Sequence, residues 1–324
     1  MSVTGFDVRW NDFPDYILGI TREIWEDRKL DTLHRYYSDN IVVRGPGSVV
    51  VGNANVIAAT MMTLAEFPDR QLLGEDVIWC DAGEGRFLSS HRLLSTATHA
   101  NHGVYGPPTG TRLQYRIIAD CAARDGVIDD EWIVRDQGAV VRQLGIDPKR
   151  FAAEAIERER FQDRVVPPFT PSIDIAGPYT GRGDEQQLGA GYADTLERIM
   201  SAGFSVIPER YDRACHLELP GGRTAHGTDA ADEFWLNLRS AFPSAEFAIH
   251  HTIGRDDAGF APRAAVRWSL TGNHDGFGAF GAPTGAPVHV MGISHAEFGP
   301  WGLRREWVTI DETAIWKQIL LAAG

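Results

Sequence analysis

One stretch of twelve residues occurs twice in this chain, and this duplication restricts the fold more than any other feature. Residues 99–110 (HANHGVYGPPTG) align with residues 274–285 (HDGFGAFGAPTG) at an offset of 175. A period this long lies far above the roughly 20–50 residues of solenoid repeats, so it indicates two copies of a complete domain. The same offset aligns, without a gap, Tyr36 with Tyr211, Phe67-Pro68 with Phe242-Pro243, Arg92 with Arg267, and Glu131-Trp132 with Glu306-Trp307.

Length and composition agree with two soluble domains. A chain of 324 residues, 43% of them apolar, is long enough for two cores. A net charge of −13 makes a nucleic-acid partner unfavourable. The three cysteines (Cys80, Cys121, Cys215) show no paired spacing, which favours a reducing, cytoplasmic location. We also expect no signal peptide in residues 1–10 and no membrane partner, because the chain has no apolar run of about 18 residues.

Within each copy, a helical pattern comes first and strand alternation follows. Residues 12–36 place apolar side chains at helical spacing, whereas residues 70–135 alternate as strands between turns. A charged helix at 148–161 precedes a segment rich in Pro and Gly. We therefore predict domains at 1–150 and 183–324, the second opening on a helix from about Glu185, joined by a linker at 151–182. Each is predicted to be α+β, with a curved antiparallel sheet wrapped around N-terminal helices and a cone-shaped pocket at its mouth.

The repeated turn and the strands beside it resemble the SnoaL-like polyketide cyclases of the nuclear transport factor 2 superfamily. The residues that carry the resemblance in the second copy are His274, Gly276, Gly278, Phe280, Gly281, Pro283 and Thr284-Gly285, and in the first copy His99, Gly103, Tyr105, Pro108, Thr109-Gly110, Gly126, Ile128, Asp130, Trp132 and Asp136. The resemblance implies two nuclear transport factor 2-like cones and cofactor-free aldol chemistry, with a carboxylate and a histidine moving protons. The strand after the turn, where the family's aspartate is expected, carries no carboxylate; the nearest candidates are Asp120 and its aligned partner His295.

The candidate catalytic residues are His99, His274, Asp130, Asp120 and His295. Histidine titrates near neutral pH, so His99 and His274 suit proton transfer at the rim of a cone. A structural role, in which each imidazole only ties its turn down, remains open. The resemblance implies that Trp132 points into the first cone together with Asp130, whose aligned position in the second copy is Arg305. The candidate substrate-binding residues are Tyr36, Arg44, His91, Tyr115, Trp132, Tyr211, His216, His250 and Trp307.

These observations support three hypotheses of function. The first is a lyase, isomerase or aldol-type cyclase that needs no cofactor and acts on a hydrophobic, aromatic or polyketide-like small molecule. The second is a non-catalytic small-molecule-binding protein with one or both cones degenerate. The third is a metal-dependent lyase with an ion near His91 and His99 or near His216 and His250, although no metal-ligand motif supports it. We expect the two copies to cover each other's sheets as an intramolecular pseudo-dimer, and further homo-oligomers remain open.

Overall fold

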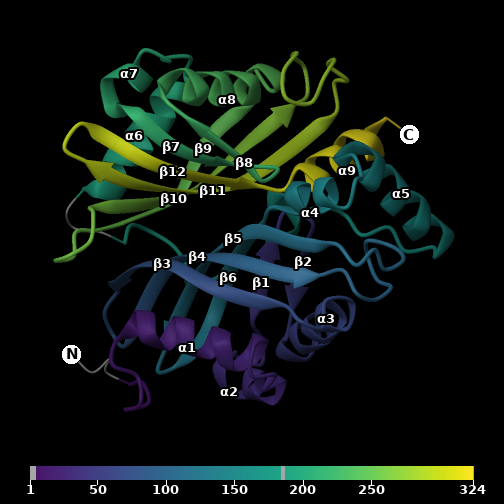
Figure 1. Ribbon diagram of the computed structural model, residues 1–324, viewed down its shortest axis with the longest axis vertical. Helices are drawn as coiled ribbons and strands as arrows, with labels where there is room; N and C mark the ends of the chain where they lie inside the picture. Colours follow the sequence, from purple (N-terminus) through teal and green to yellow (C-terminus); the bar gives the residue numbers. More distant parts are fainter. Residues whose placement is uncertain (1–4, 184–186, 324) are drawn as a thin grey trace.

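The computed structural model describes residues 5–183 and 187–323, and it shows two halves with the same order of elements (Figure 1). Repeat 1 contains α1 (Phe13–Trp25), α2 (Leu33–Tyr36), β1 (Val42–Gly45), β2 (Ser48–Val51), α3 (Asn53–Glu66), β3 (Gln71–Asp81), β4 (Arg86–Thr98), β5 (Arg112–Arg124), β6 (Val127–Arg135) and α4 (Gln137–Gln143). Helix α5 (Pro148–Phe161) follows, at the residues predicted for the charged helix.

Repeat 2 has the same elements in the same order. They are α6 (Leu188–Met200), α7 (Val206–Arg210), β7 (Tyr211–Leu219), β8 (Arg223–His226), α8 (Thr228–Ala241), β9 (Glu246–Arg255), β10 (Arg263–Asn273), β11 (Pro287–Gly299), β12 (Gly302–Ile310) and α9 (Glu312–Ala322). Both bounds of α1, β2, α3, β5 and β6 differ by 175 from those of α6, β8, α8, β11 and β12. The offset read from the sequence is therefore the structural alignment of the repeats. The predicted start of α6 at Glu185 lies outside the described residues.

Each repeat has one six-stranded sheet, with order β2-β1-β6-β5-β4-β3 in repeat 1 and β8-β7-β12-β11-β10-β9 in repeat 2. β1 runs parallel to β6, and β7 runs parallel to β12, whereas the other pairs are antiparallel. The sheets are thus mixed, which corrects the expectation of purely antiparallel sheets. The parallel pairs join segments far apart in the chain, and no local sequence pattern reports such pairing.

The two sheets face each other, and α1 to α3 and α6 to α8 lie on their outer sides (Figure 1). One hydrophobic core lies between sheet and helices in each repeat. A smaller apolar layer joins the sheets, with Ile78 and Leu88 of repeat 1 against Ile253 and Ala265 of repeat 2. Each sheet therefore has two buried faces, one toward its helices and one toward the other sheet. No helix among the described residues is long and apolar enough to cross a membrane.

Candidate functional site

Repeat 1 contains a cavity of about 420 Å³ between its helices and the concave face of its sheet. Helices α1 and α3 form one wall, and strands β3 to β6 form the other. The turn between β1 and β2 and the loop at Val104 border it. Its side chains from the helical side include Thr21, Ile24, Trp25, Leu33, Tyr37, Val56, Ala59 and Thr60, and those from the sheet include Arg70, Leu72, His91, Leu93, Ile117, Glu131, Ile133 and Arg135.

Two buried carboxylates line this cavity: Asp311 of repeat 2, which caps α9, and Glu131 on the wall formed by the sheet of repeat 1. Strand β6 pairs with β5 so that Glu131 lies opposite Cys121, which belongs to the core between sheet and helices. Glu131 is only 7% exposed, and burial raises the pKa of its carboxyl group. The Tyr37 hydroxyl, which hydrogen-bonds to this carboxyl, and the charge of Arg135 act against that rise. Glu131 is thus a base stronger than an exposed glutamate, with a hydroxyl group beside it.

Three further polar side chains surround the cavity. Burial lowers the pKa of His91 to about 4, so its imidazole is neutral at pH 7. The Arg70 guanidinium lies 4.3 Å from the centroid of the Trp25 ring, and its Nε donates to Ser95 Oγ at 3.1 Å. Arg135 is two residues beyond Ile133 on β6, on the same face as Glu131. The cavity therefore combines two buried acids, Glu131 and Asp311, with two cationic groups and apolar walls.

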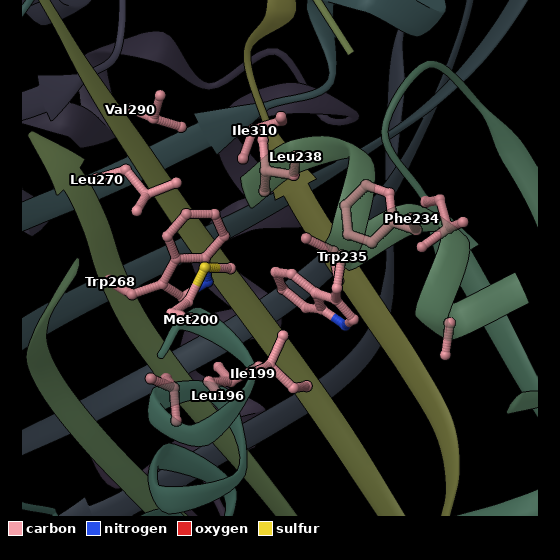
Figure 2. Close-up of a cluster of buried hydrophobic side chains, with 14 of the residues drawn as sticks. Leu196, Ile199, Met200, Phe234, Trp235, Leu238, Trp268, Leu270, Val290 and Ile310 are labelled. Carbon is pink, nitrogen blue, oxygen red and sulfur yellow. The ribbon is translucent and has the colours of Figure 1, made fainter. Parts of the chain in front are cut away.

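The inner part of the corresponding space in repeat 2 is filled by aromatic and aliphatic side chains (Figure 2), and a cavity of about 280 Å³ remains at its mouth, beside α8, β8 and the end of β12. Trp235 and Trp268, both 0% exposed, stand where repeat 1 has Thr60 and Leu93. Their rings are 6.0 Å apart and pack edge to face. Gly292 makes room for Trp268, because a Cβ at that position would lie 2.2 Å from the indole.

Glu306, the counterpart of Glu131, is enclosed within this packing and 0% exposed. Its Oε1 accepts hydrogen bonds from Tyr192 at 2.7 Å and Tyr211 at 2.8 Å, and its Oε2 accepts one from Trp235 at 3.4 Å. Burial raises its pKa to about 7. Protein donors therefore hydrogen-bond both oxygens of the Glu306 carboxyl group, whereas the Glu131 carboxyl group lines an open cavity.

Asp130 and Trp132 face the other sheet and not the cone, which corrects the orientation that the resemblance implied. Side chains alternate along a strand, so Glu131 inside the cone leaves its two neighbours outside. A register shift between Ala122 and Ala123 on β5 helps to set this pairing. The carboxylate of Asp130 pairs with the buried Arg44, and its Oδ2 accepts from the Tyr179 backbone N–H at 2.7 Å.

Asp120 and His295 lie between the two sheets, outside both cones. Asp120 pairs with Arg267 at 3.2 Å, and His295 Nδ1 accepts from Arg92 at 3.1 Å. The two arginines are aligned residues, and each lies over an aligned tryptophan of the opposite repeat: Arg267 at 4.1 Å from Trp132, and Arg92 at 3.6 Å from Trp307. These four candidates (Asp120, His295, Trp132 and Trp307) therefore form matching contacts between the sheets.

His99 and His274 are tied into the repeated turn in the same way. Each is 0% exposed, and each Nδ1 lies 3.1 Å from the hydroxyl of Thr109 or Thr284. The His99 carbonyl also accepts from the backbone N–H groups of Thr109 and Gly110. His99 Nε2 lies 3.3 Å from Glu66, without hydrogen-bond geometry. Neither histidine lines the repeat 1 cavity, so the geometry favours the structural role.

The remaining candidates are dispersed. His91 lines the repeat 1 cavity. Tyr36 lies in the core, where its hydroxyl donates to Glu23 at 2.6 Å, and Tyr115 is buried near Arg70. The others lie elsewhere: Arg44 and His250 beside a cavity between the repeats, Tyr211 in the filled cone, and His216 at the β7–β8 hairpin against Glu218 and His226.

The candidate set left out five charged or phenolic residues of this cavity: Tyr37, Arg70, Glu131, Arg135 and Asp311. Placing Glu131 inside the cone would have placed Arg135 there too, because the two are four residues apart on a strand. Tyr37 is among the polar residues expected near the mouth of the first cone, whereas Arg70 gives no such signal. Among the described residues, no group of three or more His, Cys, Asp or Glu side chains could hold a metal ion.

Family models match both repeats. A model of the SnoaL-like polyketide cyclases matches residues 16–144, and a model of the SnoaL-like domain matches residues 193–306. Together they span about three quarters of the chain. The chain consists of two tandem SnoaL-like domains. Each SnoaL-like domain is an α+β cone of the nuclear transport factor 2-like type, as the resemblance implied.

Solved structures with likeness to part of the chain include three bacterial proteins. IdmH of Streptomyces antibioticus, described as a candidate polyketide cyclase, is 23% identical, with 41% of this chain and 98% of its own covered and a TM-score of 0.36. AclR of Streptomyces galilaeus, described as a candidate hydroxylase, is 24% identical (41% and 94% covered, TM-score 0.35). A SnoaL-like polyketide cyclase of Agrobacterium tumefaciens is 23% identical (41% and 97% covered, TM-score 0.33). Comparison with curated proteins gives no match.

Proposed function

We propose that the SnoaL-like domain of repeat 1 is a cofactor-independent acid–base enzyme, acting on a hydrophobic aromatic or polyketide-like molecule bound in its cavity. Membership of the SnoaL-like polyketide cyclase family supports a cyclase or isomerase type of reaction. The observation that carries the proposal is Glu131, a buried carboxyl with a raised pKa on the wall of a cavity of about 420 Å³. Cavities of this size hold small organic ligands.

In the proposed reaction, the Glu131 carboxylate removes a proton from a carbon next to a carbonyl group of the substrate. The electron pair of the C–H bond moves into an enolate, whose oxygen gains negative charge. Arg135 and Arg70 are the cationic groups of the cavity that can stabilise this charge. In an aldol step the enolate carbon attacks a second carbonyl, and the alkoxide that forms takes the proton back from Glu131; in an isomerisation Glu131 returns the proton to another carbon of the enolate.

Tyr37 and His91 have supporting roles in this proposal. Burial holds the pKa of Tyr37 well above its usual value, so its hydroxyl stays protonated and keeps its hydrogen bond to Glu131. A neutral imidazole at His91 offers one donor and one acceptor without adding charge. Both side chains are therefore suited to orienting the substrate and the Glu131 carboxylate. Neither is assigned the removal of a proton.

Repeat 2 is proposed to act as a structural partner, because Trp235 and Trp268 occupy the volume that a substrate would need in order to reach the Glu306 carboxyl group. This corresponds to the degenerate cone in our second hypothesis, confined to one repeat. A non-catalytic binding role for repeat 1 is the alternative outcome of the test below.

Exchange of carbon-bound hydrogen in D₂O tests the proposal without knowledge of the full reaction. A panel of aryl methyl ketones, including 2-acetylnaphthalene, is incubated with the full-length protein, and deuterium uptake is followed by mass spectrometry. We expect at least one ketone to exchange faster with the wild-type protein, and this acceleration to disappear in Glu131→Gln. Acceleration that survives Glu131→Gln would refute the assigned base, and bound ketones that never exchange would support the binding role.

A further inference from the structure

A second cavity, of about 280 Å³, lies between the two repeats beneath the linker and belongs to neither cone. We propose that it is a binding site for a small uncharged aromatic molecule that carries a hydroxyl or carbonyl oxygen. Trp132, Phe169 and Met291 supply apolar walls from β6, the linker and β11. Its volume is near the lower end for ligand pockets, which fits one ring or two fused rings.

Two residues that line this cavity each carry a buried polar atom with no hydrogen-bond partner among the described residues. They are Nε of Arg267, whose residue is 4% exposed, and the hydroxyl of Tyr179, whose residue is 2% exposed. Buried donors in folded proteins are nearly always paired, so this pair of donors indicates a missing partner. In the proposed complex, the ligand oxygen accepts from the guanidinium and exchanges a hydrogen bond with the phenol.

The charges around the cavity favour a neutral ligand. Arg267 is already paired with Asp120, and Arg44 with Asp130 and Asp174. The two histidines that line the cavity add no charge at pH 7: burial lowers the pKa of His289 to about 4 and that of His250 below its usual value. Among the described residues that line the cavity, no cationic group is left to balance a carboxylate or phosphate, whose burial without a counter-charge is unfavourable.

The linker is fixed above this cavity by backbone hydrogen bonds to repeat 1. The Phe169 N–H donates to the Pro46 carbonyl at 3.0 Å, and the Tyr179 N–H donates to Asp130 Oδ2 at 2.7 Å. Gly177 lies against Asp130, where a Cβ would come within 2.2 Å of the carboxylate. The linker thus supplies Phe169 and Tyr179 as parts of a preformed wall, which reduces the entropic cost of binding.

Calorimetric titration with 2-naphthol tests the site in a full-length protein whose repeat 1 cavity is closed by Thr60→Trp. We expect saturable binding of one 2-naphthol per chain, with naphthalene, which lacks the hydroxyl, bound about five- to tenfold more weakly. Adding Tyr179→Phe, which keeps the ring, should weaken 2-naphthol by a similar factor and leave naphthalene unchanged. Met291→Trp, which fills the cavity, should abolish binding of both compounds.

Three results would overturn this inference: no saturable binding of 2-naphthol, equal affinity for naphthalene, or binding that survives both Tyr179→Phe and Met291→Trp. A circular dichroism spectrum of each variant checks that it is folded. The result does not depend on the proposed function, because Glu131 lies in the other cavity and Glu131→Gln is expected to leave 2-naphthol binding in the Thr60→Trp protein unchanged.

Discussion

The two SnoaL-like domains share a frame and a buried glutamate but differ in the volume around that glutamate. Glu131 and Glu306 occupy the same position on β6 and β12, and both have a tyrosine hydroxyl beside them. In repeat 1 the space next to the carboxyl is a cavity, and in repeat 2 it contains Trp235 and Trp268. The fold and the acid therefore do not by themselves make a site, because the size of a few neighbouring side chains decides whether a ligand can enter.

Three polar residues of the repeat 1 cavity are replaced by apolar residues at the aligned positions of repeat 2. Arg70, His91 and Arg135 of repeat 1 correspond to Ala245, Val266 and Ile310 of repeat 2. Each replacement removes a charge or a hydrogen-bonding group and leaves an apolar side chain that packs in the core. Repeat 2 thus gains apolar burial where repeat 1 keeps groups that interact with a ligand.

The largest expected effect is on turnover. Glu131→Gln should lower the rate of substrate deuteration or turnover by about 10²- to 10⁴-fold, because it removes the proposed base and keeps the shape. The matched variant Glu306→Gln should leave this rate within about twofold, since Glu306 is enclosed by repeat 2. Equal losses in the two variants, measured by steady-state kinetics, would mean that the repeats do not differ in function.

The pH profile sharpens the same comparison. If the carboxylate of Glu131 is the active form, kcat/KM falls as the pH is lowered through its pKa. Burial raises this pKa, so the acid limb should lie above pH 4.5, the usual value for glutamate. An acid limb below pH 4.5, or a limb that persists in Glu131→Gln, would assign it to another group.

Substituting the aligned residues Trp235 and Thr60 for each other should lower the free energy of unfolding more in repeat 2 than in repeat 1. Trp235→Thr opens a cavity in a packed core and should lower the free energy of unfolding by about 3–5 kcal/mol. Thr60→Trp fills a space already present and should change it by less than about 1.5 kcal/mol while abolishing ligand binding in repeat 1. Urea denaturation followed by circular dichroism measures both. A loss in Thr60→Trp as large as that in Trp235→Thr would show that the repeat 1 cavity is not open.

Glu306 should make stability depend on pH. Its pKa is about 7 in the folded protein against an ordinary value of 4.5, so the folded state binds the extra proton between these values. Stability relative to Glu306→Gln should therefore be highest below about pH 4.5 and fall by about 3 kcal/mol as the pH rises to about 7. Denaturation of both proteins at several pH values measures this difference, and a difference that stays constant would contradict the buried acid.

The smallest effect is expected at the turn histidines. His99→Gln and His274→Gln each remove a hydrogen bond to a threonine hydroxyl and should cost about 1 kcal/mol of stability. Turnover should stay within about twofold of the wild-type value in both variants, because neither imidazole lines the repeat 1 cavity. A loss of turnover above tenfold in His99→Gln alone, without a matching loss of stability, would return His99 to the site.

Much of the fold can be predicted from the sequence, because the duplication and the local patterns agree. The offset of 175 aligns whole helices and strands, and α5 spans the residues predicted for it. The parallel β1–β6 pair was not predicted, since it depends on contacts between distant segments, and the local β1–β2 hairpin was missed at its Pro46-Gly47 turn. The direction of Asp130 was wrong for a related reason: the side of a strand that faces the core is decided by its pairing with β5.

The site was harder to predict than the fold. A cavity is the difference between the space that the backbone encloses and the volume of many side chains, and no motif reports that difference. The alignment of the repeats does carry a signal, in the pairs Thr60 with Trp235 and Leu93 with Trp268. A comparison of side-chain volumes at aligned core positions therefore predicts, from the sequence alone, which cone is open and which is filled.

Crystals of the full-length protein under xenon pressure test the central difference most directly, because xenon enters apolar cavities and not packed cores. We predict xenon between Trp25, Leu72 and Leu93 in repeat 1, and none among Trp235, Trp268 and Met200 in repeat 2. Xenon among Trp235, Trp268 and Met200 in the second cone, or a first cone filled by its own side chains, would contradict the account.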